Sequence, residues 1–208
     1  MKTLITITLI CICMASSCTY GDKFSCDEEI DLWAHQNQEY FESAPRATIV
    51  SLPLDLQQAV YVSLSAGRKY ELWNYKYQLL LESDALSDAE KQEIKKLFDV
   101  LGANVYKSPR KMKKFESFAQ TWADGVVSQY GWDKTKLFYT VCTWMTEDEF
   151  NKSALSEIGI KDIPPGQEKC TCIYSIGCGA GFTCNKVSCQ QIVGCGIAGT
   201  SNCNGRCL

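Results

Sequence analysis

The stretch SPRKMKKFESFAQTWADGVVSQYG, residues 108–131, has the pattern of one long amphipathic helix. Ser108 followed by Pro109 is typical of a helix start, since serine caps the first turn and proline is tolerated at its first position. A glycine such as Gly131 commonly ends a helix. Between these signals, apolar residues recur at the spacing of a single helical face: Phe115, Phe118, Ala119, Trp122, Val126 and Tyr130.

Similar signals recur on both sides of this stretch and predict further helices. Three capping boxes are present, at Ser25-x-x-Glu28, Ser87-x-x-Glu90 and Thr146-x-x-Glu149. Apolar stripes also run through residues 53–65 and 68–83, the second of which includes Trp73. The fold class that we expect is therefore mainly α, a helical bundle of about 140 residues followed by a small disulfide-rich C-terminal module.

One segment of this region has an ambiguous pattern. Residues 137–145 contain enough β-branched and aromatic side chains to form a strand, although helices are expected on either side. The tryptophans Trp73 and Trp122 stand at core spacing, so we interpret both as core residues and not as a ligand cage.

The C-terminal 39 residues have a different composition, because they contain eight of the 13 cysteines. So short a segment buries too little apolar surface to hold one shape without cross-links, a metal or a partner. Zinc sites commonly use C-x2-C pairs, which are missing here, and no histidine is near, so we favour disulfides over a metal. The eight cysteines are Cys170, Cys172, Cys178, Cys184, Cys189, Cys195, Cys203 and Cys207.

The N-terminus predicts export. A short positive start is followed by an apolar run of limited length and then by small residues, which is the pattern of a secretory signal peptide at residues 1–17. Cys18 follows Ser16 and Ser17, as in a bacterial lipobox, and we expect it to be lipidated; cleavage near Ser17 that leaves a plain secreted protein is the alternative. The expected location is the outer membrane or cell surface, otherwise the medium.

Disulfides form and persist in the oxidising compartments that exported proteins reach. After signal cleavage and lipidation, ten thiols remain. Eight are in the C-terminal 39 residues, which we call the tail, and the other two are Cys26 and Cys142. We therefore expect four bridges within the tail and a further Cys26–Cys142 bridge. Eight cysteines allow 105 connectivities, so the pairing stays open.

Charge and composition divide the chain into regions. Residues 19–169 carry a formal charge of −6, whereas residues 170–208 carry +2 and no carboxylate side chain. The run Pro164-Pro165-Gly166 indicates a short stiff linker. The expected organisation is a signal peptide at 1–17, a tether at 18–24, a helical domain at 25–161, a linker at 162–169 and a Cys-rich module at 170–208.

The helical region lacks the patterns of an enzyme. His35 is the single histidine, and its neighbours Trp33 and Tyr40 indicate a position at the edge of a packed face. The acidic run Asp27-Glu28-Glu29 stands at a helix start, where it favours the helix dipole. No Gly-rich phosphate loop occurs. We expect no catalytic residues, no metal, no cofactor and no small-molecule substrate.

A basic run, residues 107–114, surrounds the start of the helix described first. We interpret it as a solvated face or an internal partner of the acidic surface, and contact with phosphate head groups or nucleic acid is the less favoured alternative. Nucleic acid is not an expected partner of the protein as a whole.

The tail resembles that of the bacteriocin fulvocin C-related proteins. The shared features are the opening Cys170-Thr-Cys172, evenly spaced inner cysteines, Cys195-Gly196 and the closing Cys203-Asn204-Gly205, although the closing spacing here is C-x3-C instead of C-x-C. The helical region has a pattern similar to that of the same family, Leu64-Ser65-x-x-x-Lys69-x-x-Leu72-Trp73. The resemblance implies an exported helical carrier with a bacteriocin-like tail.

Two functions are compatible with these features. In the first, the acidic helical domain masks an antibacterial tail until cleavage near Lys169 releases it, and Lys186 and Arg206 then contact an anionic bacterial membrane. Disulfides would let the tail display apolar residues: Ile173, Tyr174, Ile176, Phe182, Ile192, Val193 and Ile197. In the second, the chain is a cell-surface lipoprotein whose tail is never released and binds a protein or glycan receptor.

Overall fold

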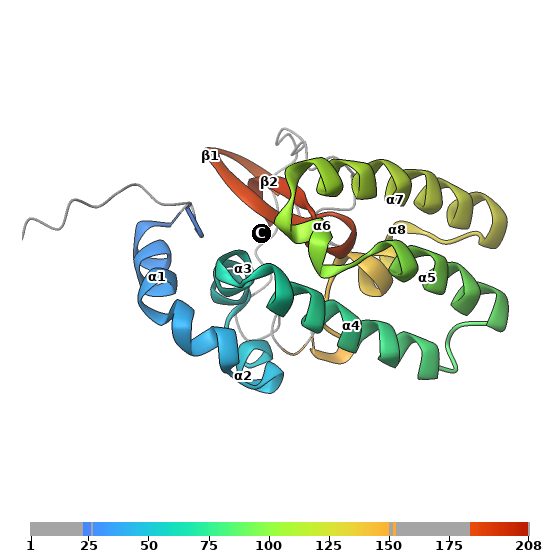
Figure 1. Ribbon diagram of the computed structural model, residues 1–208, viewed down its shortest axis with the longest axis horizontal. Coiled ribbons are helices and arrows are strands. Elements are labelled where there is room, and N and C mark those ends of the chain that lie inside the picture. The colour runs from blue at the N-terminus through green and yellow to red at the C-terminus, as the bar shows by residue number, and fades with distance from the viewer. Residues whose placement is uncertain (1–22, 26, 150–151, 153–183, 208) are drawn as a thin grey trace, which may run out of the picture.

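The computed structural model describes residues 23–25, 27–149, 152 and 184–207. Helices dominate these residues, which confirms the mainly α fold class (Figure 1). The α-helices are α1 Glu28–Ser43, α2 Arg46–Val50, α3 Leu54–Ser63, α4 Ala66–Glu82, α5 Asp88–Val100, α6 Ala103–Lys107, α7 Pro109–Tyr130 and α8 Lys134–Leu137. They are followed by a π-helix, η1 Phe138–Cys142, a 3₁₀ turn, η2 Ile197–Gly199, and two strands, β1 Cys184–Cys195 and β2 Ser201–Cys207.

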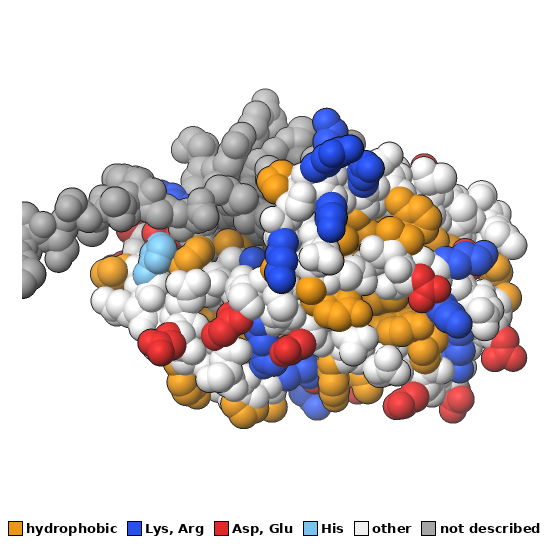
Figure 2. Space-filling model, in the orientation of Figure 1, with side chains coloured by type: hydrophobic (Ala, Val, Ile, Leu, Met, Phe, Trp, Pro, Cys, Tyr) orange, Lys and Arg blue, Asp and Glu red, His pale blue; other side chains and the backbone are white. Residues whose placement is uncertain are grey.

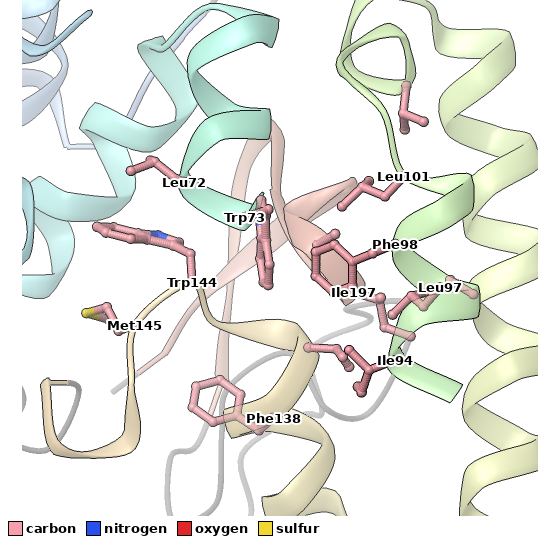
Figure 3. Close-up of a cluster of buried hydrophobic side chains, with 14 of the residues drawn as sticks. Leu72, Trp73, Ile94, Leu97, Phe98, Leu101, Phe138, Trp144, Met145 and Ile197 are labelled. Carbon is pink, nitrogen blue, oxygen red and sulfur yellow. The ribbon is translucent and has the colours of Figure 1, made fainter. Parts of the chain in front are cut away.

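The main core lies between α4, α5 and α7 and also includes residues of η1 and of the turn between β1 and β2. Trp73 of α4 is 1% exposed and Trp122 of α7 is 6% exposed, so the prediction that both are core residues is confirmed. Figure 3 shows how side chains from distant parts of the chain meet in this core, with Trp73 on one side and Ile94 and Phe98 of α5 on the other.

The helix ends follow the sequence signals at most positions. Ser87 and Glu90 form the predicted capping box at the start of α5, and Thr146 and Glu149 form the one predicted further along the chain. The box predicted at Ser25 is wrong. Asp27 caps α1 instead, because its carboxylate accepts hydrogen bonds from the N–H groups of residues 29 and 30.

Helix α7 agrees with its prediction at both ends. Ser108 accepts a hydrogen bond from the backbone N–H of Lys111, Pro109 occupies the first helical position, and Gly131 ends the helix in the left-handed conformation. Residues 137–145, where a strand was considered, are helical up to Cys142 instead. The N–H of Thr143 bonds to the carbonyl of Phe138, five residues back, and this bond defines the π-turn.

The described part of the Cys-rich tail forms a two-stranded antiparallel hairpin. Cys184 is paired with Cys207 at the open end and Cys195 with Ser201 next to the turn, with register shifts between. β1 contacts α3, and η2 contacts η1. Figure 1 shows the turn of the hairpin among the helices, so the tail and the helical domain share one packed structure there.

Candidate functional site

The most unusual site in the described residues is the buried turn of the hairpin, Gly196–Ser201. Every residue of this turn is buried, and Ile197 and Ala198 are each 1% exposed within the main hydrophobic core. Figure 3 shows Ile197 in the same cluster as Ile94, Leu97 and Phe98 of α5. The end of the hairpin therefore packs into the same hydrophobic core as the side chains of the helices.

A short hydrogen-bond network holds the backbone of the turn. The hydroxyl of Tyr61, on α3, donates to the carbonyl oxygen of Ala198 at 3.2 Å, and the hydroxyl of Tyr106, on α6, donates to the same oxygen at 2.8 Å. The indole N–H of Trp73 in turn donates to the Tyr61 oxygen at 3.0 Å. Two donors thus satisfy a single carbonyl that is buried away from water.

Burial keeps both phenols protonated, because it disfavours their ionised form. It raises the pKa of Tyr61 above its ordinary value, and it raises that of Tyr106 well above it. Both hydroxyls therefore remain hydrogen-bond donors across the physiological pH range. The network has the properties of a permanent anchor and not those of a proton-transfer site.

The backbone of the turn fits its enclosure closely. Gly199 has φ +59°, and a Cβ at that position would lie 2.6 Å from the hydroxyl oxygen of Tyr61. Ala198 also has a positive φ, 53°, which is rare for a residue with a side chain. The packing around Ala198 offsets this local cost, and only glycine fits at position 199.

This enclosure overturns one expectation about the tail. Ile197 was expected to be displayed to solvent, but it lies in the core, since the turn enters the helical domain instead of standing free. Four of the other apolar residues expected at the surface, Ile173, Tyr174, Ile176 and Phe182, lie outside the described residues. Ile192 and Val193 lie on β1.

Cys142 has a free thiol in the structure, and the predicted Cys26–Cys142 bridge stays a prediction. This cysteine packs against the core from η1, and burial raises the pKa of its thiol to about 12. Cys142 therefore acts as a small apolar side chain. Its expected partner Cys26 lies outside the described residues, as do Cys170, Cys172 and Cys178, the lipidation site Cys18, the signal peptide at 1–17 and the linker at 162–169.

The remaining cysteines of the tail lie on the hairpin, Cys184, Cys189 and Cys195 on β1 and Cys203 and Cys207 on β2. The four bridges expected in the tail stay a prediction. The two basic residues expected to contact a membrane lie near the open end, since Lys186 is paired with Gly205 and Arg206 with Asn185. Lys186 and Arg206 are thus on adjacent rungs at the end opposite the buried turn.

His35 lies where the sequence indicated, at the edge of a packed face. Its ring stacks on Phe24 with 4.1 Å between centroids, and its Nε2 lies 3.9 Å from a carboxylate oxygen of Asp31. Over the ranges that the structure describes, no group of three or more histidine, cysteine or acidic side chains is placed to hold a metal ion. Within the same ranges, no helix has the length and apolar character needed to cross a membrane.

Sequence reasoning missed two polar side chains, the buried Lys76 and the half-buried Arg46, that tie residues 144–149 to the helices. Lys76 of α4 is 4% exposed and donates to the carbonyl of Met145 at 2.7 Å, and burial lowers its pKa to about 8. Arg46 of α2 forms a two-pronged ion pair with Glu149, at 2.8 and 2.6 Å. Lys76 lies between the apolar residues of the stripe in 68–83, so it does not stand out in the sequence. The bonds of Lys76 and Arg46 also join residues far apart in the chain, which no periodic pattern records.

The pattern that carries the family resemblance lies close to the buried turn. Ser65 caps α4, Lys69 places its ammonium 5.7 Å from the centre of the Tyr61 ring, and Trp73 donates to the Tyr61 hydroxyl. Comparison with protein-family models, with curated proteins and with solved structures finds no match to this chain.

Proposed function

We propose that this chain is an exported surface protein that keeps its Cys-rich hairpin as a permanent part of the fold and uses the hairpin's open end to bind a protein or glycan. The observation that carries the proposal is the burial of Gly196–Ser201 in the helical core. Withdrawing the turn would empty the space that Ile197 and Ala198 fill, and would leave Tyr61 and Tyr106 without their acceptor. A cut in the backbone between the regions therefore does not by itself release the tail.

The energetic argument rests on the cost of an empty core site. Removing a buried side chain the size of isoleucine typically costs about 2–5 kcal/mol, because the surroundings relax only in part. Loss of a buried carbonyl's hydrogen-bond partners adds about 1–3 kcal/mol. These costs favour a tail that stays in place over one that leaves.

The test of retention is a chain with a protease site introduced within residues 162–169. After cleavage, the 170–208 fragment should co-elute with the helical domain on size exclusion and separate from it on a denaturing non-reducing gel. The same chain with Gly199→Ala should release the fragment, whereas Gly125→Ala, on α7 with nothing within 4 Å of its added Cβ, should retain it. Dissociation of the unmutated fragment at once on cutting would rule out a permanent anchor.

A bacteriocin-like function of the fulvocin C-related kind is the second proposal. The register of the hairpin supports it, because it places Lys186 and Arg206 near the open end, away from the buried turn. Under this proposal the helical domain masks the tail, and the oxidised 170–208 peptide inhibits related bacteria while the full chain does not. Lys186→Glu with Arg206→Glu should then weaken the inhibition. If the oxidised 170–208 peptide inhibits none of a broad panel of bacteria, and the cut fragment stays with the helical domain, the binding function is favoured over the bacteriocin-like one.

A further inference from the structure

A cluster of five basic residues gathers where α6 ends and α7 begins: Lys107, Arg110, Lys111, Lys113 and Lys114. All five are exposed, and none forms a salt bridge with another residue that the structure describes. No acidic residue occurs between Asp99 and Glu116. Figure 2 shows Lys and Arg side chains gathered over this part of the surface, so a strongly positive patch, the α6–α7 basic patch, stands on an otherwise acidic domain.

The geometry of α7 places its four basic residues on one side of the helix. At 100° per residue, Arg110, Lys111, Lys113 and Lys114 span an arc of about 160°. Met112 and Phe115 lie outside this arc and pack into the core, where Phe115 is 1% exposed. The four cations therefore point to the same side of the molecule, away from the core.

This placement is unfavourable for the helix itself. The N-terminus of a helix carries partial positive charge, so cations in the first turn are repelled and carboxylates are favoured. The first turn of α7 contains no acidic residue. Among the described residues, no carboxylate stands in the first turn to offset this repulsion, so an anionic partner that approached these exposed cations would stabilise the start of α7.

We propose that the α6–α7 basic patch docks on an anionic lipid bilayer. Apolar side chains continue from the patch, since Phe118 lies one turn beyond Lys114 on α7 and borders a groove of about 520 Å³ between α5 and α7. Val100, 46% exposed, lines the same groove, and the lining also includes Asp99 and the ion pair between Glu93 and Lys96. Phosphate head groups match the cations, and the boundary of the acyl region matches the adjoining apolar side chains.

A bilayer fits this surface better than a nucleic acid does. Nucleic-acid-binding domains are usually basic as a whole, whereas this chain has a formal net charge of −3 and a pI of about 5.3. Single-stranded nucleic acids are also held by exposed aromatic rings that stack on bases. The five positions of the patch itself are all Lys or Arg.

The experiment uses residues 18–208 with Cys18→Ser, so that neither the signal peptide nor an acyl chain contributes to binding. Vesicles of phosphatidylcholine, with and without phosphatidylglycerol, are sedimented with the protein, and the bound fraction gives a partition coefficient. The test variant is Lys111→Gln/Lys113→Gln/Lys114→Gln. The control is Lys91→Gln/Lys95→Gln/Lys152→Gln, which removes the same charge from positions outside the patch and the groove.

The chain should bind vesicles that contain phosphatidylglycerol and bind pure phosphatidylcholine far less. In 1 M salt, where the Debye length is about 3 Å, binding should be lost. Near an anionic surface each basic residue contributes about a fivefold gain in partition, so the test variant should bind roughly 100-fold more weakly. The control should bind within a few-fold of the parent, because its charges lie outside the patch.

Three outcomes would overturn the proposal. One is equal binding to both vesicle types. Another is a control that loses as much binding as the test variant, which would assign the effect to net charge alone. The third is stronger binding to a single-stranded nucleic acid than to the anionic vesicles at the same salt. Circular dichroism of all variants shows whether each remains folded.

Discussion

The buried hairpin turn and the start of α7 both contain residues that are unfavourable in their local conformation, but among the described residues only the turn has compensating contacts. At the turn, Ala198 takes a positive φ, and core packing and two tyrosine hydroxyls surround it. At the start of α7, Arg110 and Lys111 stand at the positive end of a helix with no internal partner among the described residues. Compensation within the fold indicates a structural role for the turn, whereas the exposed cations of α7 can take an external anionic ligand.

The start of α5 shows what a helix start optimised for stability looks like in the same chain. Ser87 and Glu90 form a reciprocal capping box, and Asp88 adds a second carboxylate in the first turn. Glu90 also accepts from the indole N–H of Trp132 and the ammonium of Lys136, each at 2.6 Å. Both α5 and α7 begin with a serine cap, so the cap does not distinguish them. The first turn of α5 contains Asp88 and Glu90, whereas that of α7 contains no acidic residue.

The largest expected effect is at Gly199, which tests whether the turn is structurally required. Gly199→Ala would place a Cβ 2.6 Å from the Tyr61 hydroxyl at a residue with φ +59°, so we expect a loss of about 2–5 kcal/mol from overpacking and backbone strain. Chemical denaturation of the full chain measures it. Gly125→Ala, in open space on α7, should instead gain about 0.5–1 kcal/mol. Equal effects at both positions would show that the turn is not held as described.

The next effect concerns Glu90 and tests the optimised helix start. Glu90→Gln removes a charged acceptor of two close hydrogen bonds, so we expect a loss of about 1.5–3 kcal/mol at neutral pH. A loss below about 0.5 kcal/mol, the range of an ordinary surface substitution, would contradict the view that this helix start is stabilised from within.

The pH dependence of Glu90 gives a second measurement on the same variant. Its hydrogen bond with Lys136 holds the pKa of Glu90 at about 2 in the folded state, below the ordinary value of 4.5. The folded state therefore binds fewer protons, and the stabilisation is present above pH 4.5 and is lost as the pH falls toward 2. The free-energy difference between parent and Glu90→Gln should shrink over that window. A constant difference down to pH 2 would contradict the assigned shift.

A smaller effect is expected at Tyr61, which links the turn to α4. Tyr61→Phe leaves the indole N–H of Trp73 without an acceptor and removes one of the two donors to Ala198, so we expect a loss of about 1–2 kcal/mol. Tyr40→Phe is the matched control, because Tyr40 is 57% exposed, and its effect should stay within about 0.5 kcal/mol. Thermal and chemical unfolding of both variants provide the comparison.

The sequence predicted the parts of this structure that depend on local signals. The cap and the stripe of α7, the capping box at Ser87 and the burial of Trp73 and Trp122 all follow from periodicity and from residues close together in the chain. The sequence does not predict the π-turn at Phe138, because short apolar runs fit a helix and a strand equally well.

The candidate site was not predictable in the same way, because it joins residues that are far apart. Ala198 meets Tyr61 and Tyr106 across 137 and 92 positions of the chain, and no local pattern records such a meeting. The run Gly-Ile-Ala-Gly at 196–199 did carry a weak signal, since it is apolar and uncharged. An independent module would display this run to solvent, whereas the structure buries Ile197 and Ala198 in the core that the helices form.

The smallest expected effect is a gain, and it tests the contrast between α5 and α7 most directly. Lys111 occupies the position in α7 that Glu90 occupies in α5, three residues after the serine cap. Lys111→Glu would allow a reciprocal capping box with Ser108 and replace an unfavourable first-turn cation by a favourable carboxylate. We expect the full chain to gain about 0.5–1 kcal/mol in chemical denaturation.

The same substitution should weaken binding to phosphatidylglycerol vesicles, because it reverses one charge of the α6–α7 basic patch. Lys95→Glu on α5 is the control, an exposed position outside both the first turn and the patch, and it should leave stability and vesicle binding nearly unchanged. A gain in stability combined with a loss of binding would show that the cations at the start of α7 lower the free energy of unfolding but are needed for binding. If Lys111→Glu instead lowered stability, the cations of α7 would have an internal role, and the contrast with the hairpin turn would disappear.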